Sequence, residues 1–245
     1  MKITAVVITY NEQNNIEACL KGLGWADERI VIDSSSTDNT VQIARNAGAK
    51  VFIHAFTNFA DMRVHALKKA RGDWILYIDA DERVTPSLAA EIKGKIEQQN
   101  YSIYTLKRKN FYLGREWPYI EEIKRLFKRD SLKGWFGDVH ESPISQGTVG
   151  SLDEYLLHYT HNDISSMVKK TNKWSEIEAK LRFDSHHPPV IWWRFFRVML
   201  TAFWEYYIHQ GGYKAGIVGL IEGIYQSFSI FITYVKLWEM QHKEK

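Results

Sequence analysis

Four short apolar runs in the first third of the chain constrain its fold more than any other feature. The runs occupy residues 3–8, 29–32, 50–53 and 74–78, and helical stretches separate them. Apolar strands that alternate with helices are typical of βαβ units, in which the strands run parallel. The sequence therefore predicts an α/β fold with a Rossmann-like, mostly parallel sheet. Ligands of such sheets bind outside the carboxyl ends of the strands.

Polar residues follow three of these runs at the predicted binding edge. Thr9-Tyr10-Asn11-Glu12 follows the first run, Asp33 follows the second, and Asp79-Ala80-Asp81 follows the fourth. Tyr10 offers an aromatic face to a base, while Glu12 and Asp33 offer acceptors to ribose hydroxyls or a base N–H. The Asp-Ala-Asp triplet can hold a divalent cation against phosphates. Such a triplet alone is often a solvated turn, but here its position outlines a nucleotide-diphosphate site.

These residues resemble those of the nucleotide-sugar-dependent family 2 glycosyltransferases, which have the GT-A fold. Within that family the chain is most similar to the subgroup that includes lipopolysaccharide core β-glucosyltransferases. The resemblance also rests on Arg63, on residues 72–82, on Arg125-Leu126-Phe127 and on Val139-His140-Glu141. It implies a nucleotide-sugar site formed by Thr9, Tyr10, Glu12, Asp33, Arg63, Asp79 and Arg125. It further implies an inverting hexosyltransferase that uses a nucleotide sugar, with a UDP-sugar as the favoured donor.

Transfer from a nucleotide sugar requires a stabilised leaving diphosphate, and the family resemblance indicates the residues that supply it. Asp81, with Asp79 helping through a ribose hydroxyl or a metal-bound water, would hold Mg²⁺ or Mn²⁺ against both phosphates. His140 would complete the metal shell or contact the diphosphate; the alternative is a hydrogen-bonded loop histidine. Arg63 and Arg125 would contact the diphosphate or the sugar, because a guanidinium matches phosphate oxygens; the alternative for either is a surface ion pair.

Glu141 is our candidate for the base that deprotonates the acceptor hydroxyl. It follows a predicted acceptor-side strand and matches the family's His-Glu position, while Asp138 is the rival. Because one carboxylate is poised as base and no second nucleophile is evident, we expect direct displacement with inversion. His158 is a possible acceptor or metal contact, although a buried, hydrogen-bonded histidine is the favoured interpretation.

Two other functional classes stay open on the sequence alone. A nucleotidyltransferase would share the acidic metal site, but it usually has a glycine-rich phosphate loop, which residues 9–12 do not offer. A non-catalytic, membrane-bound nucleotide-binding scaffold would show no donor turnover, and the intact acidic set argues against it. Basic clusters such as residues 107–109 are explained by strand faces or a diphosphate contact, so we expect no nucleic-acid partner.

The last third of the chain differs in its pattern. We expect residues 1–163 to form the catalytic domain, 164–189 a helix and linker, and 190–245 two amphipathic helices separated by Gly211-Gly212. Tryptophans beside arginines, as at Trp192-Trp193-Arg194, suit the headgroup boundary of a membrane. The sequence therefore predicts peripheral membrane binding through these helices; the alternative is packing on protein, including a homo-oligomer. A lipid-linked or lipopolysaccharide-core type saccharide acceptor would fit membrane binding.

The termini and the single cysteine bear on localisation. The chain starts directly with a predicted strand, and no small-residue cleavage site follows, so we expect no signal peptide. Cys19 cannot form an internal disulfide, and we expect it to be a small core residue in a reducing compartment. The longest uncharged stretch of the tail, residues 223–235, is shorter than the roughly 20 residues of a membrane span. We therefore expect a cytoplasmic enzyme on the inner face of the cell membrane.

Overall fold

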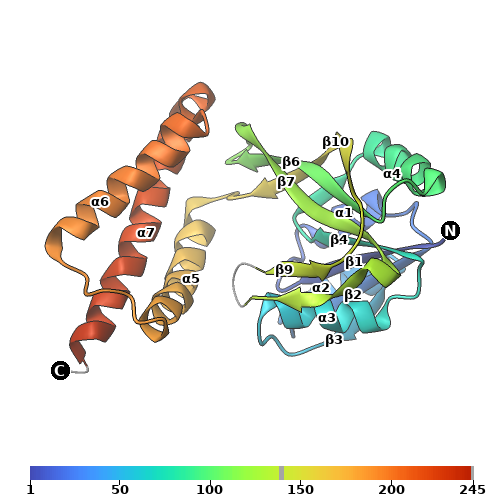
Figure 1. Cartoon of the computed structure of the whole chain (residues 1–245), viewed down its shortest axis with the longest axis horizontal. Coiled ribbons are helices and arrows are strands. Elements are labelled where there is room, and N and C mark those ends of the chain that lie inside the picture. The colour runs from blue at the N-terminus through green and yellow to red at the C-terminus, as the bar shows by residue number, and fades with distance from the viewer. Residues whose placement is uncertain (138–140, 244–245) are drawn as a thin grey trace. The chain divides into compact units, whose positions relative to one another are not determined.

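A computed structural model of the chain describes residues 1–137 and 141–243. The chain divides into two compact units, which we describe separately (Figure 1). The first unit comprises Met1–Lys109 and Glu121–His158, and the second comprises Asn110–Ile120 and Tyr159–Lys245. The second unit thus starts before the boundary predicted at residue 163. It also includes the tip of a β-hairpin that the sequence pattern assigned to the catalytic domain.

The predicted parallel strands form one half of an eight-stranded sheet with the order β3-β2-β1-β4-β7-β6-β10-β5. They are β1 (Ile3–Thr9), β2 (Glu28–Asp33), β3 (Lys50–Ile53) and β4 (Trp74–Asp79). β1 pairs in parallel with β2 and with β4, and β2 pairs in parallel with β3. The predicted α/β fold is therefore confirmed in this half of the sheet.

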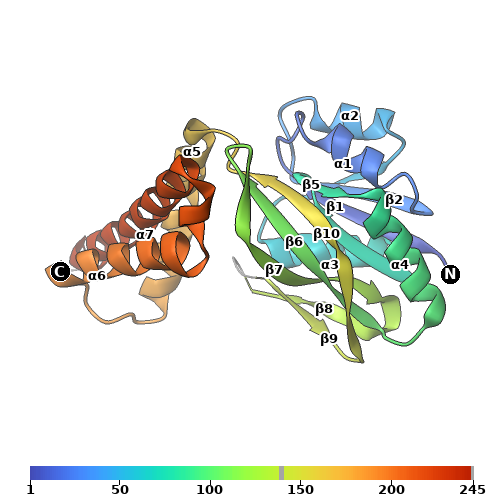
Figure 2. The same cartoon turned by 90° about the horizontal axis from the view of Figure 1, so that it is seen from above.

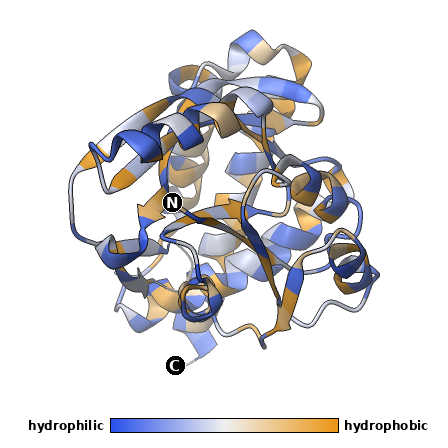
Figure 3. Cartoon of the chain, turned by 90° about the vertical axis from the view of Figure 1, so that its right-hand side faces the viewer, coloured by the Kyte–Doolittle hydropathy of each residue, from blue (hydrophilic) through white to orange (hydrophobic). Residues whose placement is uncertain are grey.

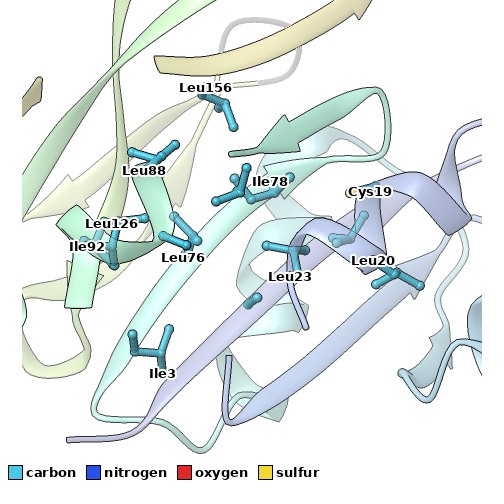
Figure 4. Close-up of a cluster of buried hydrophobic side chains, with 14 of the residues drawn as sticks. Ile3, Cys19, Leu20, Leu23, Leu76, Ile78, Leu88, Ile92, Leu126 and Leu156 are labelled. Carbon is cyan, nitrogen blue, oxygen red and sulfur yellow. The ribbon is translucent and has the colours of Figure 1, made fainter. Parts of the chain in front are cut away.

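Helices pack on both faces of these strands. They are α1 (Ile16–Gly22), α2 (Thr40–Asn46), α3 (Phe59–Lys69) and α4 (Pro86–Gln98). In β1, Ala5 and Val7 belong to one buried cluster and Val6 and Ile8 to another, because successive side chains of a strand point to opposite faces. Figure 4 shows the first cluster, where Cys19 lies among leucines and isoleucines as predicted. The helices carry both hydrophobic and hydrophilic residues (Figure 3), as expected for helices with one buried face.

The other half of the sheet contains antiparallel pairs. Its strands are β5 (Glu82–Val84), β6 (Ile103–Tyr112), β7 (Arg115–Lys128) and β10 (Val149–Thr160). Leu76 of β4 pairs with Leu126 of β7, and His158 of β10 pairs with Glu82 of β5. β6 and β7 are long strands, of 10 and 14 residues. Leu113 and Gly114 both have positive φ, which makes a two-residue hairpin turn that lets the strands continue up to it.

A separate two-stranded sheet lies beside α3. It consists of β8 (Leu132–Phe136) and β9 (Ser142–Ser145), which pair antiparallel after a 3-10 turn at Arg129–Ser131. Trp135 of β8 joins the core that contains Met62 of α3 and Tyr77 of β4. β8 and β9 therefore place Glu141, which immediately precedes β9, near the carboxyl end of the parallel strands.

The second unit contains three long helices, α5 (Ile164–Asp184), α6 (Trp192–Phe203) and α7 (Ile217–Lys243). A π-helical turn, Trp204–His209, and a 3-10 turn, Gly212–Ala215, connect α6 to α7. α7 packs along both α5 and α6 (Figures 1 and 2). The predicted helical hairpin is thus present, and α5 completes a bundle with it. The side chain of Trp117, from the tip of the β6–β7 hairpin, is buried in this unit and donates to Gln210 at 3.0 Å.

By length and composition, one helix in the described part of the chain, α7, is able to span a membrane. The expectation that no segment is long enough for a span is therefore wrong on this criterion. The core helix of a bundle meets the same criterion, and a third of the most apolar stretch of α7 is buried within the protein. α7 also buries Glu222, whose carboxylate lies 3.0 Å from Nδ1 of His161 and accepts from Gln226 at 2.7 Å.

Candidate active site

The strand register brings the predicted nucleotide-binding residues to one edge of the sheet. Thr9 at the end of β1 is level with Asp33 at the end of β2, and Ile8 is level with Asp79 at the end of β4. The carboxylate of Asp33 is buried and accepts a hydrogen bond from the backbone N–H of Ser36 at 2.8 Å. This edge corresponds to the position where parallel α/β sheets bind ligands.

The loops after β1 and β2 are tied together beside this edge. Asn11 has a left-handed backbone (φ 54°), and its side-chain oxygen accepts from the backbone N–H of Thr37 at 2.8 Å. The backbone N–H of Glu12 donates to the hydroxyl of Thr40 at 2.8 Å, which connects the first loop to the start of α2. Tyr10 exposes half of its surface beside them. The predicted residues Tyr10 and Glu12 therefore lie on a loop with a defined shape.

Asp79 is held between two arginines. Arg63 Nη2 donates to Asp79 Oδ1 at 3.1 Å, and Arg125 Nη2 donates to Oδ2 at 2.7 Å. Burial alone would raise the pKa of Asp79, but the positive charges of Arg125, Arg63 and Arg108 outweigh it and hold this pKa well below its usual range. Asp79 is therefore ionised at neutral pH, and each of its oxygens already has a cationic partner.

Arg63 connects Asp79 to the predicted base. Its Nε donates to Glu141 Oε1 at 3.0 Å, and its Nη2 lies 2.8 Å from the same oxygen. Arg63 is only 2% exposed, with its guanidinium 4.9 Å from the ring centroid of Trp135 and 5.5 Å from that of Tyr77. These rings come from β8 and β4, so packing between separate elements fixes the position of the guanidinium. Arg63 joins a base candidate to the acidic triplet.

Glu82 and Arg108 support this network and were not predicted from the sequence to be part of the site. Glu82 is fully buried, accepts from the backbone N–H of Asp79 at 2.8 Å, and accepts from Arg108 Nη1 at 3.0 Å. Burial would lower the pKa of Arg108, but Glu82 and Glu121 raise it above its usual range. Position in the sequence offered one signal, because Glu82 directly follows the acidic triplet. Arg108 lay in a basic cluster that gave no such signal.

Asp81, the second aspartate of the triplet, lies against His158. His158 Nε2 is 3.3 Å from Asp81 Oδ2, and both side chains are largely buried, with 14% and 18% exposed. This proximity follows from the pairing of β10 with β5, which places His158 level with Glu82. A carboxylate facing an imidazole nitrogen provides two donor groups that suit a divalent cation such as Mn²⁺.

The described residues do not form a complete metal cage on their own. Within residues 1–137 and 141–243, no three His, Cys, Asp or Glu side chains come together as a metal site. His140, the predicted third ligand, and Asp138, the rival base, lie outside the described residues. Asp81 and His158 therefore fit the metal that the resemblance implies only as part of a shell that phosphate oxygens would help to complete.

Three buried polar atoms at this edge have no hydrogen-bond partner among the described residues. They are Thr9 Oγ1, Arg63 Nη1 and Arg125 Nη1. A buried donor without a partner costs about 1–3 kcal/mol, and more when it is charged. The two arginines and Thr9 would recover this energy with an anionic, oxygen-rich ligand.

The structure thus brings four predicted site residues, Arg63, Asp79, Arg125 and Glu141, into one ion-paired network. It places Thr9, Tyr10, Glu12 and Asp33 along the adjoining strand ends and Asp81 beside His158. The roles of these residues in binding and catalysis stay predictions.

Comparisons with known proteins agree with this geometry. The family model described as glycosyl transferase family 2 matches residues 4–155. An uncharacterized glycosyltransferase of Rickettsia bellii is 30% identical, over 98% of this chain and 87% of the relative. The lipopolysaccharide core biosynthesis glycosyltransferase LpsC of Rhizobium meliloti is 24% identical, over 98% of this chain and 93% of the relative.

Solved structures support the GT-A fold. The structure of S. aureus TarS 1–349 in complex with UDP-GlcNAc matches with a TM-score of 0.50 and 18% identity, covering 65% of this chain and 59% of that chain. At this identity the likeness concerns the fold alone. The predicted GT-A architecture is confirmed.

Proposed function

Because the chain belongs to glycosyl transferase family 2, and is therefore a glycosyltransferase, we propose that it moves a hexose from a nucleotide sugar to a saccharide hydroxyl with inversion at the anomeric carbon. One observation carries this proposal: Arg63 joins the acidic triplet to Glu141 at the carboxyl end of β4. The groups needed for a diphosphate and for a base therefore lie in one network. Family membership disfavours the nucleotidyltransferase and scaffold alternatives.

The nucleoside part of the donor would bind over the ends of β1 and β2. Tyr10, half-exposed, supplies an aromatic face for the base. The Asp33 carboxylate accepts from the backbone N–H and the hydroxyl of Ser36. A carboxylate has about four lone-pair sites, so Asp33 retains capacity for a base N–H or a ribose hydroxyl. We favour UDP-linked donors, and a thermal-shift screen with UDP-, GDP- and dTDP-sugars would identify the nucleotide.

The diphosphate would bind between the arginines and Asp81. Arg63 and Arg125 each carry one buried Nη1 without a partner among the described residues, and both can donate to phosphate oxygens. Asp81 and His158 would hold Mg²⁺ or Mn²⁺, which stabilises the charge that grows on the leaving diphosphate. Asp79 contributes mainly by holding the two guanidiniums in place, and the Glu82 carboxylate accepts a hydrogen bond from the backbone N–H of Asp79.

Glu141 would act as the base for the acceptor hydroxyl. Among the described residues, its contacts to Arg63 use Oε1, so Oε2 is the oxygen that we expect to take the proton. Arg63 would then have two roles. It orients Glu141, and its ion pair with Asp79 fixes the position of Glu141 relative to the proposed donor site. With one carboxylate acting as base and the nucleophile supplied by the acceptor, an α-linked donor would yield a β-glycoside.

For the acceptor we propose a lipid-linked saccharide of the lipopolysaccharide-core type. The support is the relative LpsC, whose name assigns it to lipopolysaccharide core biosynthesis, together with the aromatic surface of α6. Such an acceptor is presented at a membrane. We therefore propose that the enzyme works in the cytoplasm, associated peripherally with the inner face of the cell membrane.

The decisive experiment compares donor binding with sugar transfer in two variants. Glu141→Gln should bind UDP-sugar with an unchanged affinity, because the amide keeps the shape of the side chain, but it should lose transfer since it cannot accept the proton. Asp81→Ala should lose the dependence of donor binding on Mn²⁺. A wild-type protein that shows no thermal shift with any nucleotide sugar, with or without Mn²⁺, would contradict the proposed function.

A further inference from the structure

One face of α6 and of the π-helical turn that follows it presents large apolar side chains to solvent. Trp192 is 74% exposed, Phe196 63%, Leu200 71% and Trp204 64%. These four residues, which we call the α6 stripe, recur at every fourth position. At about 100° per residue they cover an arc of roughly 120°, which is the width of the apolar face of an amphipathic helix.

The α6 stripe is not the face that packs in the helical unit. On the opposite side of α6, Val198 is buried in a cluster with Ala179, Val190, Tyr234 and Leu237. The carbonyl of Met199 accepts from the hydroxyl of Ser227 on α7 at 3.0 Å, and the rings of Phe195 and Phe231 lie 5.7 Å apart. α6 therefore has two apolar faces, of which the bundle uses one. An exposed apolar face of this size marks an interaction surface.

The charges around the α6 stripe indicate what covers it. Within residues 185–204 the formal charges are those of two arginines, Arg194 and Arg197, and the acidic residues Asp184 and Glu205 flank this segment. Arg197 is exposed at the edge of the stripe, and both guanidiniums lie over the ring of Trp193, at 5.5 and 5.6 Å from its centroid. Aromatic rings with adjacent arginines suit the boundary between acyl chains and anionic headgroups.

We propose that α6 lies in the plane of an anionic lipid surface, with the α6 stripe among the acyl chains and Arg197 at the headgroups. In this arrangement α7 remains a helix of the bundle and does not cross the membrane. Glu222 of α7 is fully buried against His161 and Gln226, and Tyr225 shares a 2.6 Å hydrogen bond with Thr171 of α5. Insertion of α7 as a span would break these contacts and place a carboxylate in hydrocarbon.

This inference deepens the proposed membrane association, and it does not depend on the transfer reaction. The test is flotation of the full chain with two kinds of vesicle, phosphatidylcholine alone and phosphatidylcholine with phosphatidylglycerol. We expect flotation with the anionic vesicles. The variant Trp192→Ser/Phe196→Ser/Leu200→Ser should lower vesicle partitioning roughly tenfold or more, because these side chains would no longer enter the acyl region. Arg197→Glu should weaken binding to the anionic vesicles only.

A matched control changes two exposed apolar residues of α7. Ile217 is 68% exposed and Ile224 56%, so Ile217→Ser/Ile224→Ser removes exposed apolar surface from the other helix and should leave partitioning unchanged. Alkaline carbonate should release the wild-type protein from membranes. Donor binding, measured by thermal shift, should be the same in all variants, which separates a failure of this inference from a failure of the proposed function.

Three results would overturn the inference. Equal flotation of the wild type and the serine triple variant would exclude the α6 stripe as the lipid contact. Retention of the wild type after alkaline carbonate, together with loss of binding in the α7 control, would show that α7 spans the membrane. A wild type that does not float but forms a dimer, which the triple variant disperses, would show that the stripe contacts a second copy.

Discussion

Replacing Asp79 with asparagine tests whether this residue acts mainly by holding Arg63 and Arg125. The substitution keeps the shape of the side chain and removes its negative charge. Arg63 is 2% exposed and Arg125 7%, so in the variant both guanidiniums would stay buried without the negative charge of Asp79 to balance their positive charges. Asp81, two residues later, lies 3.3 Å from His158 Nε2 and offers a control in the same triplet. We therefore expect Asp79→Asn to destabilise the first unit far more than Asp81→Asn.

The expected magnitude follows from the surroundings of the carboxylate. Removal of one partner from a buried ion pair typically costs about 3–5 kcal/mol. Here the Asp79 side chain is 30% exposed, and Arg63 keeps Glu141 at 2.8 Å, so solvent and the second carboxylate reduce the loss. We expect the free energy of unfolding to fall by about 2–3 kcal/mol, which corresponds to roughly 4–12 °C in melting temperature for a protein of this size.

Guanidinium chloride unfolding at several pH values provides the assay. The folded pKa of Asp79 lies below that of the unfolded chain, so its contribution to stability is present at neutral pH and is lost as the pH falls below the ordinary value of 3.8. The difference between wild type and Asp79→Asn should therefore be largest near pH 7 and should shrink in acid. Stabilities within 0.5 kcal/mol of each other at pH 7, at about the size of an ordinary surface substitution, would refute the reasoning.

Four further substitutions test the proposed site and the second unit. Asp81→Ala should lower metal-dependent transfer by about 10²–10³, and a loss below tenfold in saturating Mn²⁺ would count against the metal role. His158→Ala should raise the Mn²⁺ concentration needed for half-maximal donor binding, which titration by thermal shift measures; an unchanged titration would exclude His158 as a ligand. Glu141→Gln should retain donor binding and lose transfer in a coupled UDP-release assay, whereas normal transfer would remove Glu141 as the base. Glu222→Ala should lower the free energy of unfolding by about 1–3 kcal/mol in thermal melts, because His161 and Gln226 lose their buried partner, and an unchanged melting temperature would contradict this.

Local patterns in the sequence identified the parallel half of the sheet correctly. Residues 3–8 and 74–78 alternate between two buried clusters, and each run ends at a polar residue. The two-residue period of these strands and the positions of their ends could therefore both be predicted from the sequence. The antiparallel half was less readable. β6 and β7 continue to a two-residue turn at Leu113-Gly114, and a leucine with positive φ is not an expected turn residue.

The tail shows the same division between local pattern and spatial arrangement. The amphipathic spacing predicted a helical hairpin, and the hairpin is present. Both helices are apolar, and only the packing shows that Val198 faces the bundle while Trp192 and Leu200 face outward. The uncharged stretch 223–235 did not reveal the full 27-residue length of α7, because Glu222 is buried with a partner and does not end the helix.

By itself the sequence determined which residues lie at the ligand-binding edge, because a strand and the polar residue after it are neighbours along the chain. Only the tertiary structure decided which charges meet there. Arg63 reaches Glu141 across 78 residues of sequence, and Arg125 reaches Asp79 across 46. The physical reason is that the energy of an ion pair depends on distance and burial, and both are set by how α3, β7 and the β8–β9 sheet pack around β4. The same packing directs Asp79 to the arginines and Asp81 to His158, although one residue separates the two aspartates.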